Sequence, residues 1–241
     1  MHLFTLGTHV RARMVFCLVL LAPLAVWAQG MMDHVDLRSP RMSGADLQRA
    51  DVEKLIAAGG PIVLAELDGT RVRARRGTYR TLATAEALGR MDVRALGVQA
   101  VVTGRTADGE RCVLLGRRGS ATRVYAGLWE NAPAGGVEPP ADGAGWIGEE
   151  DLLAALHAEW REELGVEPRG RARAVALLDD PMARSVDVVF EVDAGAAFAT
   201  GCAAAGACGE YVDVAWVPVG KLGAWVQERP GAVSAPTEAL L

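Results

Sequence analysis

The stretch Glu159-Trp160-Arg161-Glu162-Glu163-Leu164-Gly165-Val166 decides how the fold of this chain is read. A helix would place Glu159, Glu162 and Glu163 on one face, where like charges repel by roughly 0.2–0.5 kcal/mol per pair. These acids also stand near the expected C-terminal end of the helix, where the helix dipole opposes negative charge. A divalent cation that takes oxygen ligands would turn this repulsion into a binding site. A solvated acidic helix face is the simpler alternative.

The segments around this stretch predict a mixed α and β protein. A helix is expected over 150–164, where Glu149 and Glu150 complement the dipole at its start, Trp160 packs, and Gly165 ends it. Strands are predicted over 97–104, 111–118, 128–130, 172–178, 186–192 and 211–217, with a short helix near 219–228. Mixed strands around one prominent helix indicate an α/β or α+β sandwich.

The region before residue 95 is predicted to be an N-terminal elaboration or a small lobe, over 31–94. Ser43 is a candidate N-cap for a helix that Gly59-Gly60 would end. Residues 61–75 resemble a hairpin turned by Asp68-Gly69, and a further helix is expected over 79–90. The main domain is then expected over 95–241.

Bulk composition excludes several classes of protein. The chain has 241 residues, of which 51% are hydrophobic and 23% charged, and its net charge is −5. This is an ordinary globular composition without a long basic run, so nucleic acid is not expected as a partner. The cysteines match no zinc pattern: Cys17, Cys112, Cys202 and Cys208.

Several separated motifs together resemble the Nudix family. Its box is Gly, five residues, Glu, seven residues, then Arg-Glu-U-x-Glu-Glu-x-Gly-U, where U is a bulky apolar residue. Glu150 followed by 158–166 fits this pattern in register, and 129–136 resembles the strand and turn that precede the box. The segments 114–118 and 210–218 also stand in the family's order. The resemblance covers about residues 96–228 and implies a Nudix-type α/β/α sandwich with a mixed sheet and an N-terminal elaboration.

The resemblance also implies a metal site. By it, Glu159, Glu162 and Glu163 would bind Mg²⁺ or Mn²⁺, the backbone carbonyl of Gly136 would be a further ligand, and Glu150 would lie in the outer part of the site. Such cations neutralise a diphosphate, lower the pKa of a bound water and stabilise the charge that develops as the P–O bond breaks. Glu159 and Glu162 are accordingly predicted to be catalytic.

The general base and the substrate contacts are open to alternatives. Glu159 is one candidate base and Glu210, before a late strand, is another, unless Glu210 is a simple edge-strand charge. Arg117 and Arg118 end a strand near the expected phosphates, and because strand residues alternate in direction only one should face them; Arg118 is favoured. Trp129 and Tyr125 are the candidates for stacking on a base, although an aromatic residue beside a central turn is more often part of the core.

Two departures from the family pattern stand out. Ala158 occupies the position of the box arginine, which in the family orients the catalytic glutamates, and neither His157 nor Arg161 is an assured substitute. The family pattern has five residues between its glycine and its first glutamate, whereas residues 137–149 separate Gly136 from Glu150 in this chain. This longer spacing predicts a loop insertion centred on 139–146. A surface loop tolerates such an insertion at little entropic cost.

The expected activity is metal-dependent hydrolysis of the diphosphate in a nucleoside diphosphate linked to another moiety. Residues 77–82 and 96–100 resemble the start of the domain in animal UDP-glucose diphosphatase, which favours a UDP-sugar as this small-molecule partner. A non-catalytic Nudix-fold nucleotide sensor and an exported protein with a structural role are the alternatives. Nudix enzymes are often dimers, so a homodimer is one expected arrangement.

The N-terminus leaves the location of the protein open. Residues 14–28 form an apolar run behind Arg11 and Arg13, which resembles a signal peptide within 1–30 and is too short for a confident membrane span. The alternative is a mis-annotated leader, with translation starting at Met31 or Met32. Because the expected substrates are mainly intracellular, a cytoplasmic location is favoured over export, and no stable membrane association is expected.

Overall fold

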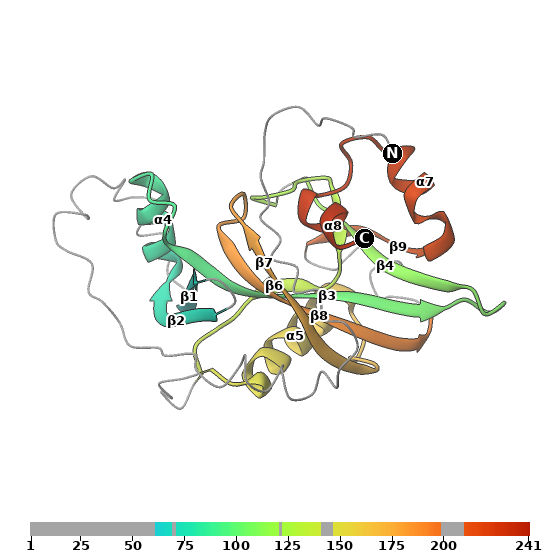
Figure 1. Ribbon diagram of the computed structural model, residues 1–241, viewed down its shortest axis with the longest axis horizontal. Coiled ribbons are helices and arrows are strands. Elements are labelled where there is room, and N and C mark those ends of the chain that lie inside the picture. Colours follow the sequence, from blue (N-terminus) through green and yellow to red (C-terminus); the bar gives the residue numbers. More distant parts are fainter. Residues whose placement is uncertain (1–60, 69–70, 121, 141–146, 199–209) are drawn as a thin grey trace.

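A mixed β-sheet forms the centre of the protein, as a computed structural model describes it over residues 61–68, 71–120, 122–140, 147–198 and 210–241. Helix α5 (Glu149–Leu164) covers one face of the sheet, and α7 (Leu222–Gln227) and α8 (Ala235–Leu240) lie on the other side (Figure 1). The predicted α+β sandwich is therefore confirmed. The leader expected over 1–30 and the helix expected over 43–58 lie outside the described residues.

The sheet divides into two parts at strand β3. The strands are β1 (Pro61–Asp68), β2 (Arg71–Thr78), β3 (Arg94–Arg105), β4 (Arg111–Arg118), β5 (Trp129–Asn131), β6 (Ala134–Gly136), β7 (Arg171–Asp180), β8 (Ser185–Ala196) and β9 (Tyr211–Pro218). β3 runs parallel to β8, which pairs with β7, and its first half also pairs with β6. β4 pairs with β3 only through Thr103, Gly104 and Arg105, and then pairs with β5 and β9. Away from this short contact, the two parts of the sheet therefore take different partners.

Helix α5 forms because its apolar residues recur every fourth position. Leu152, Leu156 and Trp160 are buried against the apolar face of β3 and β8, and Trp160 is only 1% exposed. The helix ends at Gly165, whose φ of 65° is the left-handed conformation that favours glycine. The predictions that Trp160 packs and that Gly165 ends the helix are confirmed.

The hairpin of β1 and β2 extends the same sheet. Leu64 and Ala65 of β1 pair with β3, and α4 (Tyr79–Ala87) packs Leu82 against this hairpin. The hydroxyl of Thr78 accepts a hydrogen bond from the N–H of Thr81 at 3.2 Å and so caps the start of α4. This arrangement brings the first residue of α4, Tyr79, to the edge of the main sheet.

Two short elements differ from the sequence predictions. The sequence predicts a turn over 133–136, but Ala134–Gly136 form β6 because their backbone pairs with β3. The sequence does not predict helix α8, because its 6 residues are too few to show an apolar periodicity. It is held by Ser234 as N-cap and by the hydroxyl of Thr237, which accepts a hydrogen bond from the N–H of Asn131 at 2.9 Å.

Candidate active site

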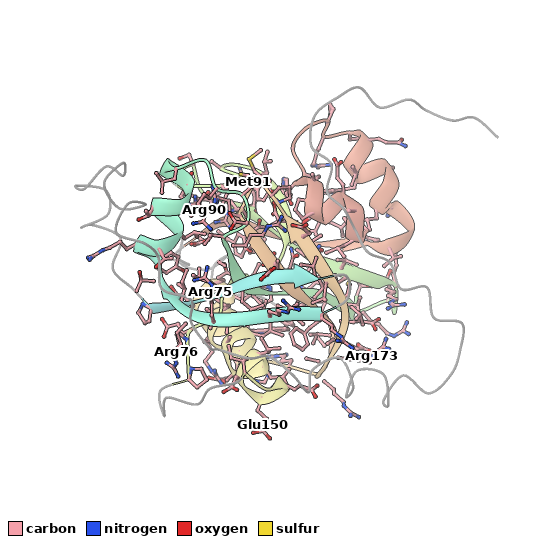
Figure 2. All side chains as sticks on the ribbon, turned by 60° about the vertical axis from the view of Figure 1, so that its left-hand side comes forward. Arg75, Arg76, Arg90, Met91, Glu150 and Arg173 are labelled. Atoms are coloured by element: carbon pink, nitrogen blue, oxygen red, sulfur yellow. The ribbon has the colours of Figure 1, made fainter. Side chains whose placement is uncertain are left out.

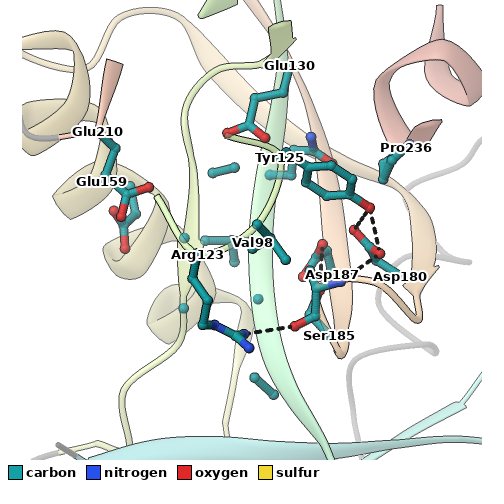
Figure 3. Close-up of a pocket in the computed structure, with 18 of the residues that line it drawn as sticks. Val98, Arg123, Tyr125, Glu130, Glu159, Asp180, Ser185, Asp187, Glu210 and Pro236 are labelled. Atoms are coloured by element: carbon teal, nitrogen blue, oxygen red, sulfur yellow. Dashed lines mark hydrogen bonds between the residues drawn. The ribbon is translucent and has the colours of Figure 1, made fainter. Parts of the chain in front are cut away.

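A pocket of about 380 Å³ lies where β3 and β4 diverge (Figure 3). Its walls come from β3, β6, β8 and the C-terminal half of α5, with loops beside β4 and β9. One part, referred to here as the glutamate side, is lined by Glu159, Glu162 and Glu210. The other part, referred to as the aspartate side, is lined by Gln99, Tyr125, Asp180, Ser185 and Asp187.

Glu159 reaches the glutamate side from α5 and lies directly against the backbone of Gly135. A Cβ atom on Gly135 would stand 2.0 Å from the Cδ of Glu159, so only glycine leaves room for this carboxylate. Burial raises the pKa of Glu159 to about 7, and repulsion from Glu162, Glu210 and Glu138 contributes to this rise. An added cation would therefore be stabilised at this place.

The three box glutamates have different surroundings. Glu162 is exposed and lines the pocket, as Glu159 does. Glu163 is 2% exposed, and its Oε2 accepts a hydrogen bond from the N–H of Ala134 at 2.9 Å. Burial raises the pKa of Glu163 well above its usual range, and this hydrogen bond opposes the shift. Glu163 thus ties β6 to α5, while Glu159 and Glu162 face the pocket.

Arg118 connects two carboxylates of the pocket. It donates through Nη1 to Oε1 of Glu130 and through Nη2 to Oε2 of Glu210, each at 2.6 Å. The hydroxyl of Tyr211 donates to the same Oε1 of Glu130 at 2.9 Å. Burial raises the pKa of Glu130, and the charge of Arg118 opposes that shift. Because Glu210 directly precedes Tyr211 in the chain, this cluster holds it through its side chain and through its neighbour.

The residues of α5 near the missing box arginine do not replace it. Ala158 is exposed, and the guanidinium of Arg161 pairs with Glu167 at 2.9 Å and donates to the carbonyl of His157 at 3.1 Å. Neither Arg161 nor His157 lines the pocket. Among the described residues, the cation that pairs with pocket carboxylates is Arg118, from β4.

Asp187 forms the floor of the aspartate side. Its carboxyl lies across Gly97, where a Cβ atom would stand 2.1 Å from Oδ1, and its Oδ2 accepts a hydrogen bond from the hydroxyl of Ser185 at 3.2 Å. Burial raises the pKa of Asp187 to about 7, although the hydrogen bond from Ser185 opposes this. Within the described ranges, no Arg, Lys or His side chain forms an ion pair with Asp187.

Tyr125 and Asp180 form the wall beside Asp187 (Figure 3). The hydroxyl of Tyr125 donates to both carboxylate oxygens of Asp180, at 2.8 and 2.9 Å, and Asp180 also accepts from the N–H groups of Met182 and Ala183. Tyr125 has a φ of 54°, which is uncommon for a residue with a side chain. The hydrogen bonds to Asp180 therefore hold the ring in a conformation that its backbone alone disfavours.

Three of the predicted site residues do not line the pocket: Trp129, Glu150, and Glu163, which binds the N–H of Ala134. Trp129 packs edge-on against Trp225, with ring centroids 5.3 Å apart, and the guanidinium of Arg117 lies 5.9 Å from its ring. Glu150 is exposed at the start of α5, about 13 Å along the helix axis from Glu159. It points away from the body of the protein (Figure 2). Trp129 is thus half-buried against the small core of β4, β9 and α7, and Glu150 is too far along the helix to reach the glutamate side.

The glutamate side offers oxygen atoms, which are the ligands that a hard divalent cation prefers. Glu159 and Glu162 offer carboxylate oxygens and Gly136 a backbone carbonyl, and all three line the same pocket. Gly135 leaves the space into which the Glu159 carboxylate fits. In the part of the chain that the structure describes, however, no three Asp, Glu, His or Cys side chains stand together as a metal cluster. Oε2 of Glu163 accepts a hydrogen bond from the N–H of Ala134, and Glu163 does not line the pocket.

Several pocket residues were not singled out from the sequence. Tyr79 lies on the edge of the pocket, with its hydroxyl 3.2 Å from where a Cβ of Gly136 would be. Gln99 and Asp187 are polar residues within largely apolar stretches of β3 and β8. The one available signal was Ser185-Val186-Asp187-Val188, because alternation puts Ser185 and Asp187 on the same face of a strand.

Comparison with known proteins gives a family and several solved structures. A family model described as NUDIX domain matches residues 93–235. Among solved structures, a NUDIX hydrolase from Alicyclobacillus acidocaldarius is 15% identical, with a TM-score of 0.43 over 61% of this chain and 89% of that one. The MutT protein from Methanosarcina mazei Go1 is 21% identical, with a TM-score of 0.41 over 59% and 86%. A comparison with curated proteins gave no match.

The described helices were also compared with the length of a membrane span. No helix within the described ranges is both long enough and apolar enough to cross a membrane.

Proposed function

Because the chain belongs to the Nudix family, we propose that it is a hydrolase that cleaves the diphosphate of a nucleoside diphosphate linked to another group. One observation carries this proposal. The carboxylate of Glu159 lies over Gly135, beside Glu162 and Glu210, in a pocket that is large enough for part of such a substrate. These neighbouring carboxylates repel one another, and a bound cation would relieve that repulsion. Such a group of carboxylates in a pocket is typical of a functional site.

In this proposal Glu159, Glu162 and the carbonyl of Gly136 hold Mg²⁺ or Mn²⁺. When bound, the ion neutralises phosphate charge and lowers the pKa of a water molecule. Glu163 has a different task. Its hydrogen bond to Ala134 keeps β6, and with it Gly135 and Gly136, at a fixed distance from α5.

Glu210 is proposed as the general base that takes a proton from the attacking water. Arg118 binds its Oε2, so the carboxylate is held at the pocket while Oε1 lies outside that hydrogen bond. Arg118, from β4, would thereby orient a catalytic glutamate, as the box arginine does from the helix in other family members. Arg118 is thus a positioning residue and also a candidate phosphate contact. Glu159, whose pKa is raised to about 7, is the alternative base.

A nucleotide sugar is the substrate class that the chain's own sequence favours. The segment 77–82, which resembles animal UDP-glucose diphosphatase, contains the N-cap Thr78 and the pocket residue Tyr79. The tyrosine hydroxyl stands beside Gly136, where it can donate to a phosphate or sugar oxygen.

A non-catalytic nucleotide-binding protein is the second candidate. Two observations favour it: Ala158 replaces the box arginine, and the described carboxylates are not gathered into a metal cluster. In that case the pocket would bind a nucleotide without hydrolysing it.

Incubation of the full chain with Mg²⁺ and a panel of nucleoside diphosphate derivatives tests the two candidates. We expect at least one compound to release a nucleoside monophosphate, and EDTA to abolish the release. If no compound is hydrolysed, while one binds equally well with and without metal, the binding protein is correct and the hydrolase is not.

A further inference from the structure

Glu130 is a buried carboxylate of the pocket to which the proposed hydrolysis assigns no task. Arg118 donates to it through Nη1 and to Glu210 through Nη2, each at 2.6 Å. The side chain of Glu130 is only 7% exposed, whereas that of Glu210 is 50% exposed. Burying a charged pair costs so much solvation that well-packed apolar residues of similar volume are often as stable or more so. Stability alone therefore gives no reason for a carboxylate at this position.

The hydroxyl of Tyr211 fixes the position of the Glu130 carboxylate. It donates at 2.9 Å to the same Oε1 that accepts from Arg118, and Tyr211 is only 3% exposed. The tyrosine ring lies against Gly116, where a Cβ atom would stand 2.8 Å from its Cδ1. Gly116 in turn pairs with Glu130 in the ladder between β4 and β5. The buried end of the cluster is therefore held by three neighbouring strands, β5, β4 and β9.

A β-bulge in β9 lies beside the other end of the cluster, at Glu210. The register between β9 and β4 shifts at Val212, which has no partner on β4 and is 61% exposed. The carbonyl of Glu210 accepts a hydrogen bond from the N–H of Gly119 at 2.7 Å. Bulges often stand next to active sites, where they change the direction of a side chain. The backbone of Glu210 is thus fixed, and its side chain is held at the pocket by Arg118.

The way in which Arg118 is shared decides how many oxygens of Glu210 it binds. A guanidinium binds one carboxylate most strongly through two parallel N–H donors, and that contact would occupy both oxygens of Glu210. Glu130 prevents a contact through Nη1 and Nη2 together, because it already accepts from Nη1. Nε of Arg118 is buried and has no hydrogen-bond partner among the described residues, so Glu210 does not bind through Nε either. Oε1 of Glu210 is therefore left outside the contact with Arg118.

We propose that Glu130, held by Tyr211, is a positioning residue of the hydrolysis. By occupying Nη1 of Arg118, it keeps one oxygen of Glu210 free to accept the proton of the attacking water. This inference rests on the proposed function, in which Glu210 is the general base. Glu130 acts through Arg118 and does not have to touch the substrate. Removal of its charge should therefore lower kcat and leave KM nearly unchanged.

Glu130→Gln keeps the size of the side chain and removes the charge that competes for Arg118. Charge-assisted hydrogen bonds are roughly twice as strong as neutral ones, so Arg118 should then bind both oxygens of Glu210. With Mg²⁺ and the preferred substrate, we expect kcat to fall by about tenfold or more, within the range that a general base contributes, and KM to stay within about twofold. Glu130→Asp keeps the charge and should recover part of the rate. Glu110→Gln makes the same chemical change at an exposed position outside the pocket and should leave both constants unchanged.

A double-mutant cycle with Glu210→Gln separates positioning from a general loss of structure. Because Glu130 acts only through Glu210, adding Glu130→Gln to Glu210→Gln should not lower kcat any further. A further loss of the same size as in the wild type, or a rise in KM with kcat unchanged, overturns the inference while the hydrolase itself stands. If Glu130→Gln does not fold, Tyr211→Phe removes only the hydroxyl, and its smaller loss of kcat should likewise vanish beside Glu210→Gln.

A crystal structure of Glu130→Gln tests the arrangement without any measurement of activity. Arg118 bound to both oxygens of Glu210 supports the role of Glu130, whereas an unchanged contact through Nη2 alone overturns it. Failure of the wild type to hydrolyse any nucleoside diphosphate derivative is a different outcome. It removes the proposed function, and with it the reaction that Glu130 would serve, whatever the crystal structure shows.

Discussion

The two sides of the pocket contain polar groups of different origin in the chain. On the glutamate side, Glu159 and Glu162 come from one helix, and their spacing alone marks them in the sequence. On the aspartate side, Asp187 and Gln99 come from different strands and meet only through the parallel pairing of β3 with β8. The first kind of site can be recognised within one segment, and the second exists only after the sheet has formed.

This difference also separates the expected roles. Each side uses a glycine to admit a carboxyl, Gly135 for Glu159 and Gly97 for Asp187. Repulsion from other glutamates adds to burial at Glu159, while Asp187 receives a hydrogen bond from Ser185. Damage to the glutamate side should therefore change the rate of the reaction, and damage to the aspartate side should change the choice of substrate.

The largest effect is expected from Glu162→Gln, which keeps the size of the side chain and removes its charge. Turnover should fall by roughly 10²–10⁴-fold, because a carboxylate that holds the cation in the proposed function is lost. Measured kcat with the preferred substrate, and a circular dichroism spectrum to show the intact fold, check this. Glu167→Gln, an exposed glutamate outside the pocket, is the matched control. Full activity in Glu162→Gln would remove the glutamate side from the mechanism.

Arg118→Met should give the largest effect on stability. Arg118 and Glu130 have side chains only 11% and 7% exposed, so the variant leaves a buried carboxylate without its cation. Breaking such a pair typically destabilises a protein by about 3–5 kcal/mol. Arg117→Met removes a half-exposed pair with Asp213 and should change the free energy of unfolding by less than about 1 kcal/mol.

Urea unfolding of both variants checks this difference, and kinetics extend it to function. Where Arg118→Met still folds, Glu210 is no longer held, so kcat should fall. An unchanged kcat in the folded variant would show that Glu210 does not depend on Arg118. Arg118→Lys keeps the charge and should recover part of the stability but less of the rate, since it loses the two-pronged contact.

The elements of the fold that the sequence predicts correctly are those whose signal lies within one segment of the chain. Helix α5, the hairpin of β1 and β2, and the strand Arg111–Arg118 are predicted by spacing, turn residues and alternation within each segment. The sequence predicts a turn in place of β6 because its three residues become a strand only by pairing with β3. α8 depends on the cap Ser234 and on a contact between Thr237 and Asn131, far away in the chain.

The site shows the limits of a family motif in the same way. The motif led to Glu159, Glu162 and Gly136, which line the pocket, but it also led to Glu150, which does not. Tertiary packing decided the remaining cases. Trp129 packs against Trp225, and Glu163 binds the N–H of Ala134. No rule based on spacing along one chain segment could give these partners.

Alanine at each of the two glycines compares the sides directly. Gly135→Ala places a Cβ 2.0 Å from the Glu159 carboxyl and must displace it. A shift of about 1 Å in a catalytic group can lower the rate by up to roughly 10²-fold, so kcat should fall. Gly97→Ala displaces Asp187 instead, and it should lower kcat less because Asp187 lies apart from Glu159 (Figure 3). Steady-state kinetics of the two variants with the preferred substrate measure this difference. Equal loss of kcat in the two variants would mean that the sides do not have separate roles.

The smallest expected effect is a change in how stability depends on pH in Asp187→Asn. Burial raises the pKa of Asp187 to about 7, above its value in the unfolded chain of about 3.9, and repulsion from Asp180 and Glu130 contributes. Between these two values the folded protein retains a proton that the unfolded chain loses. The contribution of Asp187 to stability is therefore fully present below about pH 4, and it declines as the pH rises to about 7.

The asparagine side chain does not titrate, so Asp187→Asn should gain stability relative to the wild type across that window and keep a constant advantage above it. Melting temperatures of the two proteins, measured at intervals between about pH 4 and pH 8, give the difference curve, which also cancels the titration of Glu159. Asp193→Asn, changed at an exposed position of the same strand, should give a flat curve. If the curve for Asp187→Asn is flat as well, the carboxyl is solvated in the folded protein, and the contrast between the two sides of the pocket loses its electrostatic basis.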